Sequence, residues 1–307
     1  MGVPPPAAVR GPLSRDIVLP SVVTESEPID GTIELIRTTR FCVNDRSFGD
    51  PASQIATDPN GYAAKPAMRG LGRYYSVDVT ARGRPDPVTG YLIDIKAIDQ
   101  AVRGSVVPMI AEACHDEPSR EPATLLPDLV RALANALPVS LASLRWNLTP
   151  SSSITMHAPT DTQHATAVIL RTRFDFAAAH RLHVDSLSDE ENRTLFGKCN
   201  NPSGHGHNYQ VEPAVEAPLP ESGPMPFTML DLERLTDESI IEAFDHTNLN
   251  VDPPDFSQAG VNPSVEHIAR ACYERLGRAI DATNSGARLL EITVWETDRT
   301  RCTYPAS

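Results

Sequence analysis

The sequence predicts an α+β protein made of two similar units in tandem, each with two strands, two helices and two closing strands. A glycine-rich segment, GLGRYY from Gly70, recurs as GHGHNY from Gly204. A helical apolar spacing is also repeated, as Leu126, Leu129, Val130, Leu133 and Leu137 and again as Val265, Ile268, Ala269, Cys272 and Leu276. A length of 307 residues is enough for two domains, each with its own core.

Composition places the boundaries between these units. Residues 1–30 are rich in proline and small residues and lack the apolar run of a signal peptide or membrane span, so we expect a disordered tail. We expect the first unit over residues 31–155 and the second over 168–307. The segment between them, 156–167, is polar and turn-prone and is expected to be a linker.

The elements of the second unit follow in order along the chain. Strands are expected over 167–176 and 205–215, helices near 232–244 and 265–276, and closing strands from 289–296 onward. Asn262 before Pro263 predicts a helix start, with an N-cap side chain and a proline at the first helical position. In the first unit, LRWNLTP from Leu144 corresponds to the last strand.

Charge and cysteine content exclude several classes of protein. A net charge of -13, without a basic stripe, argues against nonspecific binding to nucleic acid or to an anionic membrane. Five cysteines at irregular spacing do not form a disulfide framework. Because free thiols persist in a reducing compartment, we expect a cytoplasmic protein.

A candidate metal site is centred on His205 and His207. Only Gly206 separates them, and in an extended chain residues i and i+2 project to the same face, so both imidazoles can reach one ion. His180 is a candidate third ligand from a preceding strand. Three protein ligands with one open position are typical of a catalytic zinc, and Cys199 is then a candidate base or nucleophile.

Five separated motifs resemble the 6-pyruvoyl-tetrahydropterin synthase and 6-carboxytetrahydropterin synthase family. They are FGKCNNPSGHGHNY from Phe196, AAAHRL from Ala177, LSDEEN from Leu187, FDHTNLN from Phe244 and WETD from Trp295. The resemblance implies the T-fold, an antiparallel four-stranded sheet with two helices on one face. It also implies assembly, since this family closes three units into a twelve-stranded barrel and stacks two barrels.

The resemblance assigns roles to individual residues of the second unit. It implies that His180, His205 and His207 bind Zn2+, that Cys199 is the general base as thiolate, and that Asp245 and His246 form a proton relay. It implies that Glu296 accepts hydrogen bonds from the pterin ring and that Glu266 is a second carboxylate of the pterin pocket. Three basic residues are candidate contacts to a triphosphate, namely Arg181, Arg193 and Lys198.

The implied activity is that of a zinc-dependent carbon–oxygen lyase, which converts 7,8-dihydroneopterin triphosphate to 6-pyruvoyl-tetrahydropterin with loss of triphosphate. An alternative is 6-carboxy-5,6,7,8-tetrahydropterin synthesis for queuosine-type deazapurines. Relatives of that type usually have three residues between the cysteine and His-Gly-His, whereas here five intervene, Asn200 to Gly204. A second alternative is a non-catalytic, zinc-stabilised assembly module.

The first unit resembles the same family but without its metal ligands. On the sequence alignment of the two units, Leu71 and Arg73 replace the two histidines, Ser47 stands near the place of His180, and Lys65 or a neighbour takes that of Cys199. Asn147 falls where Glu296 would be. Cys114, His115 and Asp116 form a competing candidate site, but no ligand cluster accompanies them.

The duplication also predicts an assembly. Three two-unit chains supply the six units of two stacked barrels, so we expect a trimer that binds a small-molecule substrate. Because the resemblance places active sites between subunits, we expect the three catalytic units in one ring and the three degenerate units in the other.

Overall fold

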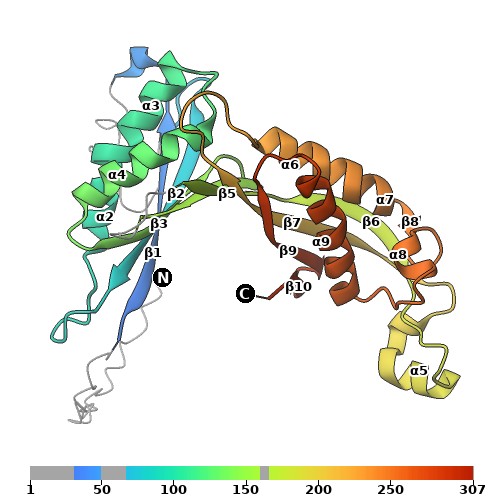
Figure 1. Cartoon of the computed structure of the whole chain (residues 1–307). Coiled ribbons are helices and arrows are strands. Elements are labelled where there is room, and N and C mark those ends of the chain that lie inside the picture. Colours follow the sequence, from blue (N-terminus) through green and yellow to red (C-terminus); the bar gives the residue numbers. More distant parts are fainter. Residues whose placement is uncertain (1–30, 50–66, 160–165, 307) are drawn as a thin grey trace, which may run out of the picture.

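Strands from both halves of the chain join in one sheet of ten strands, and the helices pack against it in two groups, one for each half (Figure 1). The computed structural model describes residues 31–49, 67–159 and 166–306. The predicted tail and half of the predicted linker, residues 160–165, lie outside these residues. Within the described ranges, no helix has both the length and the apolar character needed to cross a membrane.

The first half is an antiparallel sheet with its helices inserted between the second and third strands. The strands pair in chain order, as β1 (Ile33–Val43), β2 (Arg73–Gly83), β3 (Ser140–Asn147) and β4 (Ser152–His157). The helices are α2 (Ile95–Ala101), α3 (Val107–Asp116) and α4 (Leu126–Ala136), and a π turn, Val102–Val106, joins the first two.

The second half repeats this order around one long strand. One edge of β7 (His205–Pro218) pairs with β5 (Ala167–Thr172) and β6 (Phe174–His180), and its other edge pairs with β9 (Arg288–Thr297), which pairs with β10 (Thr300–Tyr304). The helices are α5 (Asp189–Phe196), α6 (Met229–Thr236), α7 (Glu242–Phe244), α8 (Pro254–Ser257) and α9 (Val265–Asp281).

The two halves also share an irregularity of pairing. The register between β2 and β3 shifts between Thr80 and Ala81, and that between β7 and β9 shifts between Ala214 and Val215. Both shifts fall at the same distance from the tyrosines that end the repeated glycine-rich segments, Tyr75 and Tyr209. The strand pairs β2–β3 and β7–β9 therefore share the position of an irregularity of the kind that a β-bulge produces.

Two features of the sheet differ from the sequence expectation. First, β4 pairs antiparallel with β5, so the halves form one continuous sheet rather than two separate ones. The expectation that the two units of a chain lie in different rings is therefore wrong. Second, β8 (Thr247–Asn248) pairs parallel with β6, so the sheet is mixed and not purely antiparallel. The chain leaves α7 beside β6 and follows its edge, where Leu249 N donates to the Ala179 carbonyl.

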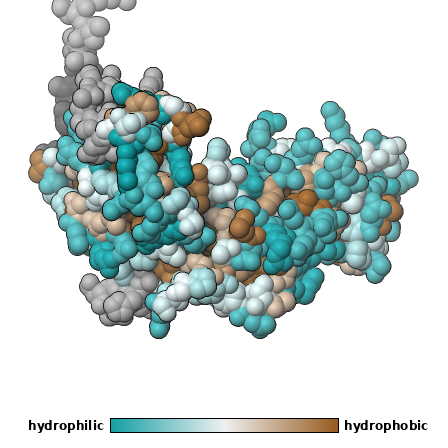
Figure 2. All heavy atoms as spheres, turned by 90° about the horizontal axis from the view of Figure 1, so that it is seen from above, coloured by the Kyte–Doolittle hydropathy of each residue, from teal (hydrophilic) through white to brown (hydrophobic). Residues whose placement is uncertain are grey.

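The predicted helical stripes form the core. In α4 and just beyond it, Leu126, Leu129, Val130, Leu133 and Leu137 are buried, and so are Val265, Ile268, Ala269, Cys272 and Leu276 in α9. These helices turn their apolar faces to the sheet, as their 3.6-residue spacing requires. The outer surface seen in Figure 2 is mostly hydrophilic, with apolar side chains in small groups.

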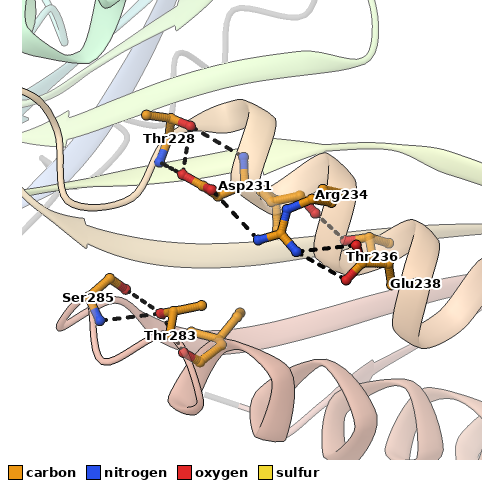
Figure 3. A network of polar contacts seen from close by, with 9 residues as sticks. Thr228, Asp231, Arg234, Thr236, Glu238, Thr283 and Ser285 are labelled. Carbon is orange, nitrogen blue, oxygen red and sulfur yellow. Dashed lines mark hydrogen bonds and ion pairs between the residues drawn. The ribbon is translucent and has the colours of Figure 1, made fainter.

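The helices of the second half begin at identifiable caps. At the start of α6, Thr228 Oγ1 accepts from Asp231 N at 3.3 Å, and Thr228 N donates to Asp231 Oδ2 at 2.9 Å, a capping box (Figure 3). The predicted start of α9 is wrong, because the N-cap residue is Ser264. Asn262 and Pro263 remain outside the helix, where Asn262 Oδ1 accepts from His183 N and the Pro263 carbonyl contacts His180.

Candidate active site

Three histidines lie close together at the last residue of β6 and the first residues of β7. His180 and His205 lie directly opposite each other in the antiparallel pair, and His207 lies two residues further along β7. Alternation along a strand places all three on the face that also carries buried Tyr209. One nitrogen from each ring can be chosen so that all three lie within 4.8 Å of one another, the arrangement predicted from the spacing.

The hydrogen bonds of His180 show which nitrogen faces the cluster. Its ring is fully buried, and Nδ1 lies 2.7 Å from the carbonyl oxygen of Pro263. Because a carbonyl only accepts, Nδ1 carries the proton and Nε2 keeps its lone pair. That Nε2 lies 3.2 Å from His205 Nε2. The proline displaced from the helix start thus orients a candidate metal ligand, which the sequence pattern did not indicate.

The buried nitrogens of the cluster fit a cation. His205 Nδ1 and His207 Nε2 are buried and have no hydrogen-bond partner among the described residues. Burial lowers the pKa of His180 and also that of His207, which keeps both imidazoles neutral and able to donate lone pairs. A borderline-soft divalent metal such as zinc prefers such a set of nitrogen ligands.

Tyr209 is a site residue that the sequence analysis missed. Its hydroxyl lies 3.4 Å from His180 Nδ1, and its ring packs edge-on against His207. Burial raises the pKa of Tyr209, so the phenol stays protonated. Its position in the sequence could have predicted this role. Tyr209 follows His207 by two residues, and a strand repeats every two residues, so both side chains lie on one face.

Glu296 reaches the same cluster from the neighbouring strand. Trp295 lies opposite Gln210 in the pairing of β9 with β7, so Glu296 lies beside Tyr209. Its Oε1 lies 3.5 Å from His180 Nε2 and 3.7 Å from His207 Nε2. The carboxylate thus sits against the imidazoles, in place to accept hydrogen bonds from a ligand bound over the cluster.

Cys199 shares a cavity with His205. The cavity has a volume of about 740 Å³, and basic side chains from three positions line it, Arg181, Arg193 and Lys198. The short helical turn that carries Cys199, Gly197–Asn200, is tied to the segment after β6. Leu182 N donates to the Cys199 carbonyl at 2.9 Å, and Asn200 Nδ2 donates to the Leu182 carbonyl at 2.7 Å. These contacts hold the backbone of the turn that carries Cys199 at the cavity that His205 also lines.

Asp245 and His246 form a pair beside β6, and the cavity that His246 lines also includes His207 of the cluster. Asp245 Oδ1 accepts from Ala177 N at 2.8 Å, and its Oδ2 lies 2.7 Å from His246 Nδ1. These bonds lower the pKa of Asp245, the one from Ala177 most. The His246 ring is 82% exposed and lines a cavity of about 420 Å³ with Asn208, whose side chain points away from the cluster. Within one chain, Cys199 and His246 therefore line different cavities.

Glu266 lies in the first turn of α9, close to the loop that holds His180. A hydrogen bond from Ser264 lowers the pKa of Glu266 and keeps the carboxylate ionised. Glu266 is exposed and does not line the Cys199 cavity.

The corresponding end of the first half has no metal cluster among the described residues. In the first half Val43 pairs with Arg73, and in the second half Ala178 pairs with His207. Two residues after Val43 is Asp45, and two residues after Ala178 is His180. Asp45, and not Ser47, therefore corresponds to His180. Ser76 pairs with Asn147 as Gln210 pairs with Trp295, so Leu148 and not Asn147 corresponds to Glu296. The sequence alignment was one or two residues out of register here because no motif anchored it. Lys65 lies outside the described residues.

The competing candidate in the first half is dispersed in the structure. His115 Nε2 lies 3.1 Å from the Asn44 carbonyl, Asp116 pairs with Arg46, and Cys114 faces a separate cavity. The three side chains contact different partners and do not converge.

Comparison with known proteins places the chain in a family. The family model for 6-pyruvoyl tetrahydropterin synthase matches residues 169–307. The 6-pyruvoyl tetrahydrobiopterin synthase of Homo sapiens is 39% identical over 132 residues, 43% of this chain and 87% of that protein. That of Poecilia reticulata is 40% identical over 129 residues, 42% of this chain and 84% of that protein.

Among solved structures, that of the 6-pyruvoyl tetrahydropterin synthase of Caenorhabditis elegans is similar to this chain. The match covers 46% of this chain and 96% of the Caenorhabditis elegans chain, with 31% identity and a TM-score of 0.41. The sequence relationship covers nearly the whole length of the human protein, and the matched region holds the histidine cluster, Cys199 and Glu296. The chain belongs to the 6-pyruvoyl tetrahydropterin synthase family.

Proposed function

We propose that the second half of the chain is a zinc-dependent carbon–oxygen lyase that converts 7,8-dihydroneopterin triphosphate to 6-pyruvoyl-tetrahydropterin, with loss of triphosphate. The observation that carries the proposal is the shared cavity of Cys199 and His205, at the edge of a three-histidine cluster, in a chain that over 132 residues is 39% identical to human 6-pyruvoyl tetrahydrobiopterin synthase. A structural zinc site would not require a thiol and three basic residues beside its ligands.

His180, His205 and His207 would hold the zinc, since one nitrogen from each ring lies within 4.8 Å of the others, and His205 Nδ1 and His207 Nε2 lack other partners among the described residues. The bound ion supplies Lewis acidity toward oxygens of the substrate side chain. Around it, Tyr209 and the Pro263 carbonyl keep the His180 ring in one orientation and one tautomer. Glu296 accepts hydrogen bonds from N–H groups of the pterin, where a charged acceptor binds more strongly than a neutral one.

Cys199 is assigned as the base that removes a carbon-bound proton of the substrate side chain. Lys198 and Arg181 line the same cavity, so the assigned base lies beside two positive charges. With Arg193 they also offer three cations to the triphosphate, against one carboxylate, Asp189. The cavity is therefore locally positive, as a polyanionic substrate requires on a chain of net charge -13.

Asp245 and His246 are assigned to proton relay in an active site shared between chains. Within one chain His246 lines a cavity other than that of Cys199, and Asp245 is hydrogen-bonded to it. The exposed ring of His246, held at Nδ1 by Asp245, leaves Nε2 available to a neighbouring chain. Glu266, ionised at the start of α9, is assigned to the pterin pocket.

The first half is proposed to be a degenerate T-fold unit that arose by tandem duplication. Its support is the common strand order, the matching shift of register and the repeated helix. In this proposal residues 31–155 form that unit, 168–307 form the catalytic unit, and the chain is a cytoplasmic homo-oligomer.

The test is incubation of the purified, zinc-loaded protein with 7,8-dihydroneopterin triphosphate, followed by mass spectrometry of the products. We expect triphosphate and 6-pyruvoyl-tetrahydropterin. Formation of 6-carboxytetrahydropterin together with acetaldehyde would assign the alternative synthase activity. Bound zinc without turnover, in preparations of the intact oligomer, would indicate a non-catalytic assembly module and would refute the proposal.

A further inference from the structure

Two strands at the ends of the continuous sheet have an outer edge with no partner strand among the described residues. One is β1, which pairs with β2, and the other is β10, which pairs with β9. β1 is 11 residues long, contains neither proline nor lysine, and leaves Ile36 64% exposed. Because natural proteins usually shorten, kink or cover an edge of this kind, we expect a partner strand there.

The junction between the two halves shows how such edges can join. In it the last strand of the first half, β4, pairs antiparallel with the first strand of the second half, β5. Ile154 lies directly opposite Leu170, and both side chains are fully buried. The chain thus already joins the end of one half to the beginning of the other. The two outer edges are again an end, β10, and a beginning, β1.

The strand registers identify the residues of the outer edges that match this buried pair. Positions are counted along β2 and β7 from the tyrosines that end the repeated glycine-rich segments. Across β3 from Ile154, and across β9 from Cys302, lies the second residue after the tyrosine. Leu35 and Leu170 each lie opposite the sixth residue after it. Cys302 therefore corresponds to Ile154, and Leu35 corresponds to Leu170.

The matched residues at the outer edges are not yet fully buried. Leu35 and Cys302 both pack against the core, but each side chain remains partly exposed. At the junction inside the chain, Ile154 and Leu170 are 0% exposed. An edge-to-edge contact would remove the remaining apolar surface of Leu35 and Cys302 from water, as the internal junction does for its own pair.

The directions of the strands also permit the same junction between two chains. From β1 to β10 the sheet is crossed in seven pairings, and each of them is antiparallel. Because seven is odd, β1 and β10 run in opposite directions. A second copy that continues the sheet beyond β10 therefore presents its β1 antiparallel to β10, with the helices of both copies on the same face.

We propose that β10 of one chain pairs antiparallel with β1 of a second copy of this chain, in the register that places Cys302 opposite Leu35. The only two charged residues among the four resulting pairs have opposite signs, so no like charges face each other. The interface does not depend on the activity proposed for the second half. The four pairs are Arg301 with Ile36, Cys302 with Leu35, Thr303 with Glu34, and Tyr304 with Ile33.

The experiment uses the full chain carrying Leu35→Cys, treated with a mild oxidant at low protein concentration. Covalent products are separated by non-reducing electrophoresis, and the linked peptides are identified by mass spectrometry. We expect most chains to be joined to another chain by a disulfide between the introduced thiol and Cys302. Residues directly opposite in an antiparallel pair have Cα atoms about 4.5–5.5 Å apart, within the range that a disulfide spans.

Ile33→Cys is the matched control for register, because residue 33 lies two positions along the same face of β1. It should link to Cys302 at least about tenfold less, since a diagonal neighbour lies about 7–8 Å away, beyond the usual span of a disulfide. Adding Cys302→Ser to Leu35→Cys should abolish the link. A link that persists in that double variant would show that β1 edges pair with each other and would overturn the proposal.

A second pair of substitutions keeps the test decisive if Leu35→Cys does not fold. Ile36 and Arg301 are both exposed, so the double variant Ile36→Cys with Arg301→Cys changes no core contact. In the proposed register it should also join chains through a disulfide between the two introduced thiols. Chains that stay monomeric on oxidation in both designs, or that link equally well through Ile33→Cys and Leu35→Cys, would contradict the proposed pairing.

Discussion

Zinc content and stability should change together when one histidine of the cluster is removed. Among the described residues one group of three ligands can hold a metal, so the purified protein should contain one zinc per chain. The corresponding positions of the first half are Asp45, Leu71 and Arg73, which offer a single carboxylate. His205→Ala leaves two imidazoles, and we expect the affinity for zinc to fall by at least about 100-fold, or about 2.7 kcal/mol.

The effect on stability follows by mass action. At a zinc concentration of about 100 times its Kd, binding to the native state stabilises the protein by about 2.7 kcal/mol. At the same concentration the variant, with its Kd raised about 100-fold, is half occupied and gains about 0.4 kcal/mol. The difference, about 2.3 kcal/mol, corresponds to a decrease in Tm of roughly 5–9 °C for a unit of this size.

The assays are elemental analysis after gel filtration and thermal unfolding with and without a chelator. His157→Ala is the control, since His157 is an exposed residue of β4 far along the sheet from the cluster. It should keep both the zinc and the stabilisation. Two tightly bound zinc ions per chain, or equal zinc content in His205→Ala and His157→Ala, would refute the assignment of a single three-histidine site.

Four further changes test other parts of the structure. Cys199→Ala should retain zinc and lower turnover by about 100-fold or more, the contribution of a general base, whereas Cys302→Ala, another half-buried thiol, should not. Glu296→Gln should raise KM by about tenfold with zinc still bound, because the pterin loses a charge-assisted hydrogen bond, and an unchanged KM would contradict this role. Asp99→Asn should lower the free energy of unfolding in urea by about 3 kcal/mol, since the 2% exposed carboxylate pairs with Arg37 at 2.7 Å. Glu34→Gln, in the exposed pair with Arg82, should lower it by less than about 1 kcal/mol, and equal losses would refute the distinction. A fragment from about residue 160 exposes the edge of β5 that β4 covers, so size-exclusion chromatography should show self-association or loss of material, and a stable, fully active oligomer would contradict this.

The features predicted from the sequence are those with a local period. His205 and His207 share a face because a strand repeats every two residues, and Val265, Ile268 and Cys272 share one because a helix repeats every 3.6. The third candidate ligand, His180, comes from a distant motif, and its pairing with His205 brings it next to His205 and His207. In each case the neighbours in space are set by regular backbone geometry.

The features that were missed depend on contacts between distant segments. Pro263 fits the first turn of a helix by its own preference, but its carbonyl instead accepts a hydrogen bond from His180, and the helix begins two residues later. The parallel strand Thr247–Asn248 is too short to have a pattern of its own. The register of the first half relative to the second required the pairing of strands, because a slip of one residue leaves the apolar pattern recognisable.

Continuity of the sheet restricts how whole chains assemble. The outer edges of β1 and β10 are unpaired within the described parts of the chain, and between them the sheet runs through both halves by way of β4 and β5. If chains join edge to edge, each chain adds two units. A closed ring of whole chains then contains an even number of units. The three-unit ring implied by the family resemblance cannot be built in this way.

Each catalytic half also has its own first half as the neighbour across β5. If chains join head to tail, the neighbour across β10 is again a first half, so no two catalytic halves are adjacent within a ring. The first half carries no cluster of metal ligands among its described residues and has Asp45, Leu71 and Arg73 at the corresponding positions. Under the proposed function, a second catalytic half that presents Asp245 and His246 to Cys199 would have to approach from another ring. In that case we expect the proposed relay to depend on the stacking of rings and not on their closure.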